Sequence, residues 1–530
     1  MSGQRLRSDP RLAPPAWNPL ASAPRRRVRL LIWLAIPLAL WYFGWLLQPD
    51  RIGHPALYAL LVGAELFNLV QAAGFWWTLR RAHAALPGGR PRESPVDVLI
   101  PVYDEPVEIV EPTVAAACRM RGRGITVHLL DDGERDELNE LARRHGVRYV
   151  RRSQHSGAKA GNINFALRRT KAPFVLVLDC DHVPAPALVE RTLGLMDDER
   201  IAFVQAPQYY GNSRSGGIAA AAWAQQALFF GAISRGKAGH GAMFCCGTNV
   251  LFRRTALESI GGFPTDSVTE DFELSIKLCE RGWESRYVPE VLATGLGPED
   301  MSSYVSQQQR WARGCLGAIG SALRARLPGR ARLQYLLSSM YFLSGWTLLA
   351  YMSFPVIRIL TGAQPIAEAT ADQFLLHFAP YFGVALATVA VAGAGAYTFA
   401  GFALAAASFW IGIQATIRAL LGRAARFVVT PKRGAAQRQP RAVVPALVAI
   451  AVLIGVCGYG LAVSRSPGTL NNIAFALLHV TVLGCGAWGA LTRRRTDGAG
   501  SLRGGDDAAR TTAAVNGRPR RRPVELEEAA

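Results

Sequence analysis

The sequence has few cysteines, and none of them form a CxxC pair, the spacing typical of structural zinc sites and dithiol redox centres. The eight cysteines also lack the regular, even framework of small secreted domains. Two of them, Cys457 and Cys485, lie inside apolar runs. We therefore expect reduced thiols and no structural metal, as is usual for cytosolic or membrane-buried cysteines.

Acidic residues are scarce relative to basic ones: 39 Asp and Glu stand against 59 Lys and Arg, for a formal net charge of +20. Such an excess favours an anionic partner, which could be nucleic acid, an anionic membrane leaflet or a phosphorylated ligand.

Apolar residues make up half of the chain, and many lie in runs of about 20 residues, long enough to cross a bilayer. The first run lacks the small-residue cleavage site of a signal peptide. A long polar segment of mixed α/β character separates the second run from the third, which predicts a soluble domain between membrane helices. The six runs lie near 28–47, 56–79, 335–357, 374–397, 443–463 and 471–491.

The distribution of basic residues predicts the orientation in the membrane. Arginines precede the first run and follow the second and sixth, whereas the loop at 361–373 has no Lys or Arg. Six crossings satisfy this bias, with the central domain and both termini in the cytoplasm and the chain in the inner (plasma) membrane. A seventh apolar stretch, 398–421, holds Gln414 and Arg418, so we expect an amphipathic helix in the membrane interface.

Between residues 95 and 315, short apolar runs alternate with helical patterns, which is typical of a mostly parallel sheet. Three runs, at 96–100, 126–130 and 175–178, end in polar residues, and ligands bind at the carboxyl ends of strands in such sheets. One such ending is weak evidence of a site, because Asp-Gly after a strand is most often a turn. The three endings are Tyr103 to Glu105, Asp131 with Asp132, and Asp179 with Asp181.

Asp179 and Asp181 are separated by one position, so on a regular strand their carboxylates would point the same way and repel each other. A divalent cation removes that repulsion, and oxygen donors suit Mg²⁺ or Mn²⁺. A phosphorylated substrate would then reconcile acids at the site with a basic chain. His182 could be a further ligand, although we favour a supporting or packing role.

Two further segments carry polar residues that suit chemistry. Ser267 and Glu270 match a capping box at a helix start, where the acids could simply favour the helix dipole, or Asp271 could act as a general base. Arg310 can grip a diphosphate and Trp311 can stack on a sugar. The alternative for that pair, an interfacial aromatic beside a basic anchor, is equally consistent with the sequence.

In chain order the sequence carries DDG at 131–133, DCDH at 179–182, TED at 269–271, QQQRW at 307–311 and FVVTPK at 427–432. This series resembles the D, DxD, TED, QxxRW and FxVTxK motifs of the family 2 processive glycosyltransferases of the bacterial cellulose synthase type. The resemblance covers about 95–435. It implies an α/β GT-A-type domain inserted between transmembrane α-helices, with about six crossings plus interfacial helices.

The resemblance also implies the site. Asp271 would be the catalytic base, and Asp179 and Asp181 would bind Mg²⁺ (or Mn²⁺). The nucleotide-sugar would be held by Tyr103, Glu105, Asp131, Lys159, Gln307, Arg310, Thr430 and Lys432. The acceptor would be bound by Trp311, Cys246 and Glu270.

The implied function is elongation of a β-linked polysaccharide, most similar to a cellulose-like β-1,4-glucan, from a UDP-sugar with transfer across the membrane. The alternatives are a non-processive transferase acting on a lipid, or a synthase of mannan, β-1,3-glucan, chitin or hyaluronan. Partners would be the donor, the growing glycan, membrane lipid and an accessory subunit on the periplasmic or cell-surface side, but no nucleic acid. The FVVTPK segment at 427–432 matches the gating loop of the family. No PilZ-like motif follows it, so direct regulation by cyclic-di-GMP is not expected.

These inferences divide the chain into seven parts. They are a basic N-terminal segment (1–27), two transmembrane helices (28–79), the cytoplasmic GT-A domain with an interfacial QxxRW helix (95–330), two transmembrane helices (335–397), an interfacial helix with a gating loop (398–435), two transmembrane helices (443–491) and a disordered tail (494–530).

Overall fold

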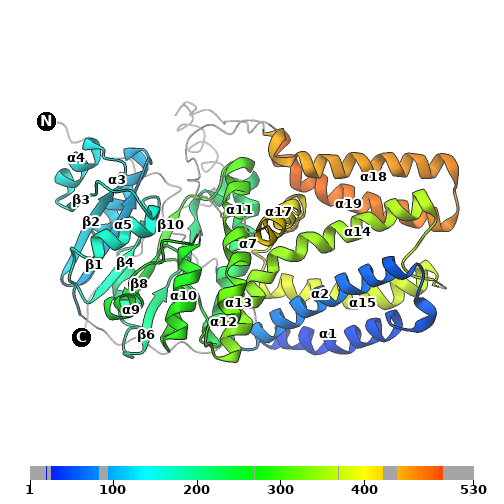
Figure 1. The fold of residues 1–530 in the computed structure, drawn as a ribbon, viewed down its shortest axis with the longest axis horizontal. Coiled ribbons are helices and arrows are strands. Elements are labelled where there is room, and N and C mark those ends of the chain that lie inside the picture. The colour runs from blue at the N-terminus through cyan, green and yellow to red at the C-terminus, as the bar shows by residue number, and fades with distance from the viewer. Residues whose placement is uncertain are drawn as a thin grey trace, which may run out of the picture. The chain divides into compact units, whose positions relative to one another are not determined.

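The computed structural model describes residues 20, 25–82, 93–215, 217–267, 269–367, 369–421 and 439–492. These residues belong to one compact unit of the chain, Met1–Thr492. The tail at 494–530, the gating motif at 427–432 and most of the basic N-terminal segment lie outside the described residues. Figure 1 shows two kinds of structure in the described part, an α/β domain and a group of long helices beside it.

A seven-stranded sheet forms the centre of the α/β domain, in the order β3-β2-β1-β4-β8-β6-β9. Neighbouring strands are parallel except where β8 pairs antiparallel with β4 and β6, so the predicted mostly parallel sheet is confirmed. The strands are β1 (Val96–Val102), β2 (Ile125–Asp131), β3 (Arg148–Arg151), β4 (Phe174–Val177), β6 (Ile201–Gln205), β8 (Val250–Arg253) and β9 (Glu284–Tyr287). A second, three-stranded sheet joins β5 (Val183–Pro184), β10 (Ala293–Gly295) and β7 (Tyr209–Tyr210).

Apolar side chains pack on both faces of the large sheet. In β1, Val98 and Ile100 belong to one buried cluster, whereas Leu99 between them belongs to another. The first cluster includes side chains of α3 (Val107–Ala117), α4 (Asp136–His145) and α6 (Leu188–Leu193). The second includes side chains of α5 (Ala158–Leu167), α9 (Arg254–Ser259) and α10 (Glu270–Glu280). Burial on both faces explains why these strands read as continuous apolar runs.

The parallel strands place the loops that leave β1, β2 and β4 at one edge of the sheet. The first two of these loops contact each other, because the backbone N–H of Asp132 donates to the carbonyl of Val102 at 2.9 Å. The three polar strand ends were predicted to lie close together, and they do so because β1 pairs in parallel with both β2 and β4.

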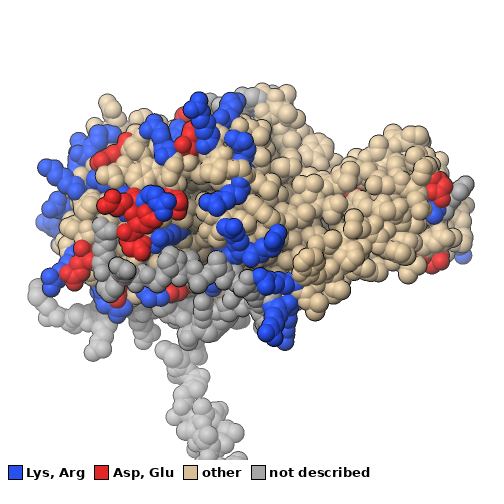
Figure 2. All heavy atoms as spheres, turned by 90° about the horizontal axis from the view of Figure 1, so that it is seen from below, with Lys and Arg blue, Asp and Glu red and all other residues tan. Residues whose placement is uncertain are grey.

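Six helical segments of the described chain are long and apolar enough to cross a membrane. They are α1 (Arg25–Leu46), α2 (Pro55–Leu79), α13 (Gly329–Met340) continued by α14 (Ser344–Thr361), α15 (Ala371–Ala392), α18 (Val444–Val463) and α19 (Pro467–Leu491). Helix α1 packs on α15, α2 on α14, and α18 on α19. On the face drawn in Figure 2, charged side chains cover the α/β domain and are nearly missing from the flank of these helices.

The stretch expected to form one amphipathic helix contains two. Helix α16 (Phe399–Ala407) and α17 (Trp410–Leu420) are bent by 43° relative to each other. Gly412 lies against the carbonyl of Phe342, where a Cβ would be only 2.0 Å from the oxygen. Close backbone packing at such small residues is typical of membrane helix interfaces, and it gives α17 a buried face that the amphipathic reading did not include.

Glu65, an acid in the middle of α2, faces other helices, as expected for an ionisable residue in a membrane span. Its side chain is only 5% exposed, and the hydroxyl of Tyr351 in α14 donates to Oε1 at 2.9 Å. Asn68 in turn donates to the Tyr351 hydroxyl at 2.7 Å. This hydrogen-bonded group joins α2 to α14.

Candidate functional site

The candidate metal site lies in the turn that follows β4. The strand ends at Val177, and the backbone N–H of His182 donates to the carbonyl of Asp179 at 3.0 Å. One ligand atom from each of Asp179, Asp181 and His182 lies within 4.8 Å of the others. The sequence predicted that the two carboxylates lie on a regular strand, but this is wrong: they lie in the turn after β4, which brings them together.

His182 belongs to this group more closely than the sequence indicated. Its Nδ1 lies 3.1 Å from Oδ1 of Asp181, and its Nε2 is buried without a hydrogen-bond partner among the described residues. Gly295 of β10 packs on the ring, because a Cβ there would lie 2.5 Å from Nε2. His182 therefore contacts Asp181 at the candidate metal site. The oxygen donors of the two carboxylates suit Mg²⁺ or Mn²⁺.

Lys159 connects the metal turn to the segment before β8. It lies in the first turn of α5, and its Nζ donates to Oδ1 of Asp179 at 2.5 Å and to the carbonyl of Gly247 at 2.7 Å. Burial opposes the charge, but the carboxylates of Asp179 and Glu270 raise the pKa of Lys159 above its usual value. A protonated amine is thus fixed beside the candidate metal site, where it can attract a diphosphate.

Asp271 lies at the start of α10 and, like Lys159, approaches Gly247. A Cβ at Gly247 would lie 3.0 Å from Oδ2 of Asp271 and 3.8 Å from Nζ of Lys159. Burial, followed by the negative charge of Glu270, raises the pKa of Asp271 to about 7. A carboxyl group with such a pKa can accept a proton near neutral pH.

The predicted capping box at this helix start is wrong. The helix begins at Glu270 with Thr269 as N-cap, and no side chain caps it. The hydroxyl of Ser267 accepts instead from the backbone N–H of Thr269 at 3.3 Å. Glu270 is thereby left at the first helical position beside Asp271, where its charge contributes to the raised pKa.

Helix α11 (Met301–Gly317) brings the QxxRW residues to the same place. Gln307 donates to the hydroxyl of Tyr210 at 3.4 Å, and the charge of Arg310 acts on both Tyr210 and Asp271. Further along the helix, Gly314 packs on the side chain of Thr269, where a Cβ would be 2.1 Å away. Trp311 follows Arg310 on α11 and is partly buried.

The segment that contains Cys246 runs beside α10. The backbone N–H of Cys246 donates to Oε1 of Gln205, and Gln208 donates to the Cys246 carbonyl at 2.7 Å. Nearby, the rings of Phe244 and Phe272 meet edge to face at 4.9 Å. Cys246, a predicted acceptor-binding residue, directly precedes Gly247, which both Lys159 and Asp271 approach.

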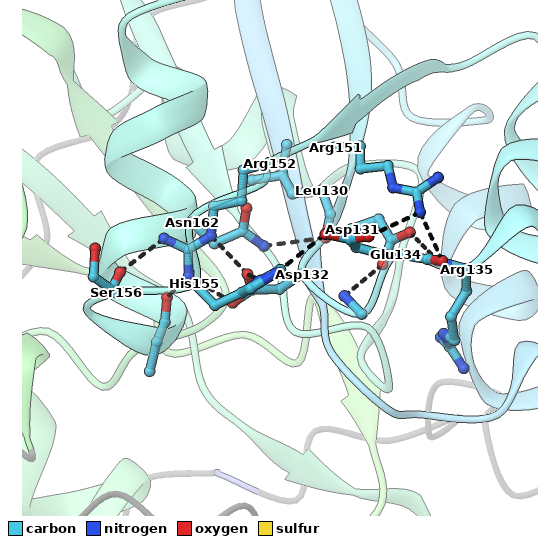
Figure 3. Close-up of polar contacts among 12 residues, drawn as sticks. Leu130, Asp131, Asp132, Glu134, Arg135, Arg151, Arg152, His155, Ser156 and Asn162 are labelled. Atoms are coloured by element: carbon cyan, nitrogen blue, oxygen red, sulfur yellow. Dashed lines mark hydrogen bonds and ion pairs between the residues drawn. The ribbon is translucent and has the colours of Figure 1, made fainter.

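Asp131, which we expected to bind the nucleotide, has its carboxylate hydrogen-bonded within the protein. It is fully buried, and its two oxygens accept from the backbone N–H groups of Gly133 and Arg135 (Figure 3). The hydroxyl of Tyr149 also donates to Asp131, at 2.6 Å. Tyr103 is half exposed, and its backbone N–H donates to Glu105 at 3.0 Å. Asp131 thus shapes the loop after β2, and the half-exposed Tyr103 lies in the loop after β1. Thr430 and Lys432 lie outside the described residues.

A second group at this edge escaped the sequence reading. Arg152 forms two hydrogen bonds of 2.6 Å with the carboxylate of Asp132, and His155 lies 2.8 Å from the same carboxylate (Figure 3). Two aspartates stand at the end of β2 (131–132) and two arginines at the end of β3 (151–152). These doublets were local signals, but only the parallel pairing of β2 with β3 shows that Asp132 and Arg152 meet.

Comparisons with known proteins agree with this geometry. A family model described as "Glycosyl transferase family group 2" matches residues 174–400. Cellulose synthase 2 of Novacetimonas hansenii is 30% identical over 88% of this chain, and the cellulose synthase catalytic subunit [UDP-forming] of Xanthomonas axonopodis pv. citri (strain 306) is 35% identical over 60%. The chain spans 31% and 46% of the length of these two relatives.

Among solved structures, a mannosyltransferase from Pyrobaculum calidifontis in complex with GDP-Man and Mn²⁺ superposes with a TM-score of 0.51. The match covers 69% of this chain and 99% of that one at 17% identity, so it bears on the fold alone. The α/β domain is therefore a glycosyltransferase domain of the GT-A type, flanked by apolar helices. The resemblance to the family 2 glycosyltransferases that the ordered motifs predicted is confirmed by the family model over 174–400 and by the cellulose synthase relatives.

Proposed function

We propose that this chain is a membrane-embedded, inverting glycosyltransferase that elongates a β-linked glucan from UDP-glucose and passes the product across the membrane. Its similarity to cellulose synthases over most of its length supports a cellulose-like β-1,4-glucan as the product. The α/β domain and both termini would face the cytoplasm, and an accessory subunit could receive the glucan on the other side.

The donor would bind at the edge of the sheet where β1, β2 and β4 end. Asp179, Asp181 and His182 would hold Mg²⁺ or Mn²⁺, which when bound neutralises charge on the diphosphate. Lys159 and Arg310 approach from α5 and α11 and add two fixed positive charges to the diphosphate site. Tyr103 and Glu105 in the loop after β1 would contact the uracil end, together with the loop that Asp131 shapes.

Asp271 would be the general base. Its carboxyl group accepts the proton of the acceptor hydroxyl while that oxygen attacks the anomeric carbon and the UDP oxygen leaves with the bonding electrons. A single displacement converts an α-linked donor into a β-linked product. The pKa of about 7 suits this step, because the group is then ionised at working pH yet basic enough to take a proton.

The acceptor end of the glucan would lie over Gly247. Cys246 and Glu270 flank this position, and Trp311 on α11 could stack on a sugar ring, as aromatic faces do in sugar sites. Gln307, whose side chain donates to the hydroxyl of Tyr210, would also bind the diphosphate. Thr430 and Lys432 would close over bound nucleotide as a lid does, excluding water from the reacting atoms.

The observation that carries this proposal is the approach of both Lys159 and Asp271 to Gly247, which sets a candidate base beside a candidate donor site. The test is to incubate the purified protein with Mg²⁺ or Mn²⁺ and a series of UDP-sugars, and to measure UDP release. We expect release with UDP-glucose above the other sugars. No release from any UDP-sugar would contradict the proposal, and a soluble lipid-linked product would favour the non-processive alternative.

A further inference from the structure

Arg152 lies outside the motifs of the site and makes hydrogen bonds to two loops beside it. Its guanidinium is almost fully buried, and it donates to both carboxylate oxygens of Asp132 at 2.6 Å. It also donates to two backbone carbonyls further along the chain, those of Ser156 at 2.8 Å and Ala158 at 3.0 Å. Figure 3 shows Arg152 between the loop after β2 and the turn that leads into α5. One side chain thus ties two loops together.

The turn that receives these hydrogen bonds has an unfavourable backbone. Gly157 has a φ of 75°, and Ala158, which has a Cβ, has a φ of 45°. A non-glycine residue in the left-handed region is strained, so it persists only where its surroundings hold it. The two carbonyls bonded by Arg152 lie directly before and at these strained positions. Arg152 therefore stabilises the turn through two of its carbonyls.

This turn decides where Lys159 points. Ala158 is the first residue of α5 and Lys159 is the second, and no side chain caps the helix start. Packing allows little freedom, since a Cβ at Gly161 would lie 2.0 Å from the Ser156 carbonyl and 2.7 Å from Nη1 of Arg152. A shift of the turn would carry Lys159 away from Asp179 and the Gly247 carbonyl, its two acceptors.

We propose that Arg152 is a positioning residue for donor binding: clamped on Asp132, it locks the turn at 156–158 so that Lys159 faces the diphosphate. The inference rests on the proposed function and extends it to a residue outside the motifs. It also gives Asp132 a task distinct from that of Asp131, because Asp132 anchors the clamp to the end of β2. His155 covers the same carboxylate from the solvent side.

The test compares the affinities of UDP and uridine, measured with Mg²⁺ by competition against a fluorescent UDP derivative. Arg152→Lys keeps the charge but loses the fork, and we expect UDP to bind about 10–100-fold more weakly, as is common when the residue that orients a ligand-binding group is changed. Uridine, which has no diphosphate, should bind as it does to the parent. Arg151→Lys is the matched control, since Arg151 is exposed and pairs with Glu134 and Asp136, and it should change neither affinity.

A double-mutant cycle with Lys159→Met separates this role from general support of the fold. If Arg152 acts through Lys159, then Arg152→Lys will add almost nothing to the UDP loss caused by Lys159→Met. Additive losses, equal losses for UDP and uridine, or parental UDP affinity in Arg152→Lys would each overturn the proposal. Should Arg152→Lys fail to fold, Gly161→Ala displaces the clamp without changing a charge and must give the same UDP-selective loss.

The parent protein distinguishes the two levels of the account. If it binds no UDP in the presence of Mg²⁺ or Mn²⁺, the proposed function fails. If it binds UDP and the Arg152 variants bind it equally well, only the positioning role fails.

Discussion

Gly247 and Asp271 lie so close together that a Cβ at position 247 would be 3.0 Å from Oδ2 of Asp271, closer than an ordinary van der Waals contact. The same glycine accepts from Lys159 through its carbonyl and has a φ of 83°. The proposed base and the proposed diphosphate ligand therefore meet on one residue that cannot carry a side chain.

Gly247→Ala should lower turnover by about 10–100-fold, because a shift of about 1 Å in a catalytic group can have that effect. UDP affinity should fall less, because the added methyl group would be 3.0 Å from Oδ2 of Asp271 but 3.8 Å from Nζ of Lys159. The measurement is the steady-state rate of UDP release beside the UDP dissociation constant.

Gly282→Ala is the control for backbone strain. Gly282 has a φ of 82°, and a Cβ there would have no atom within 4 Å. The two variants share the strain, so equal losses of activity in both would show that strain, and not the contact with Asp271, reduces turnover.

The acid limb of the pH–rate profile should report Asp271. Its carboxyl group must be ionised to accept a proton, so kcat/KM should fall about tenfold per pH unit as the pH drops below its pKa of about 7. Asp271→Asn should lose about 10²–10⁴-fold in kcat while binding UDP normally. Glu273→Gln, which removes an acid from the same helix, should keep both the rate and the profile. A parental rate in Asp271→Asn would exclude the assignment.

Removal of divalent metal should abolish donor binding. We expect EDTA to eliminate UDP binding and Mn²⁺ or Mg²⁺ to restore it, and Asp181→Asn to require much higher metal concentrations because an anionic ligand is lost. The control is Asp136→Asn, whose carboxylate is 96% exposed and lies away from the metal turn. Isothermal titration of UDP at several metal concentrations measures both variants; UDP binding that is indifferent to metal would refute the site.

The parts of the site that could be predicted from the sequence are those whose signals are local. The apolar runs depend on neighbouring residues, and the strands and membrane-length helices that they predicted are confirmed. The group of Asp179 and Asp181 was also correct in outline, although the reason differed. The carboxylates were assigned to a strand because the apolar run continues to Leu178, whereas pairing with β8 ends at Val177 and leaves them in a turn.

The features that the sequence did not reveal depend on contacts between distant segments. Arg152 meets Asp132 across 20 positions because β2 and β3 pair in parallel, and no local pattern indicates that register. The break between α16 and α17 likewise lies in an unbroken apolar stretch, where composition cannot indicate the packing of Gly412 on Phe342. The predicted capping box at Ser267 and Glu270 was wrong: the N-cap is Thr269, which Gly314 of the distant helix α11 contacts.

Linkage analysis of the product tests the central claim most directly. The purified protein, supplied with UDP-α-glucose and Mg²⁺ or Mn²⁺, should make an insoluble glucan whose linkages are β-1,4 and which a β-1,4-glucanase digests completely. The Asp271→Asn variant, assayed in parallel, should make none while still binding UDP. A product with α-linkages would contradict the single displacement on Asp271, and parental polymer from Asp271→Asn would contradict the placement of the base beside Gly247.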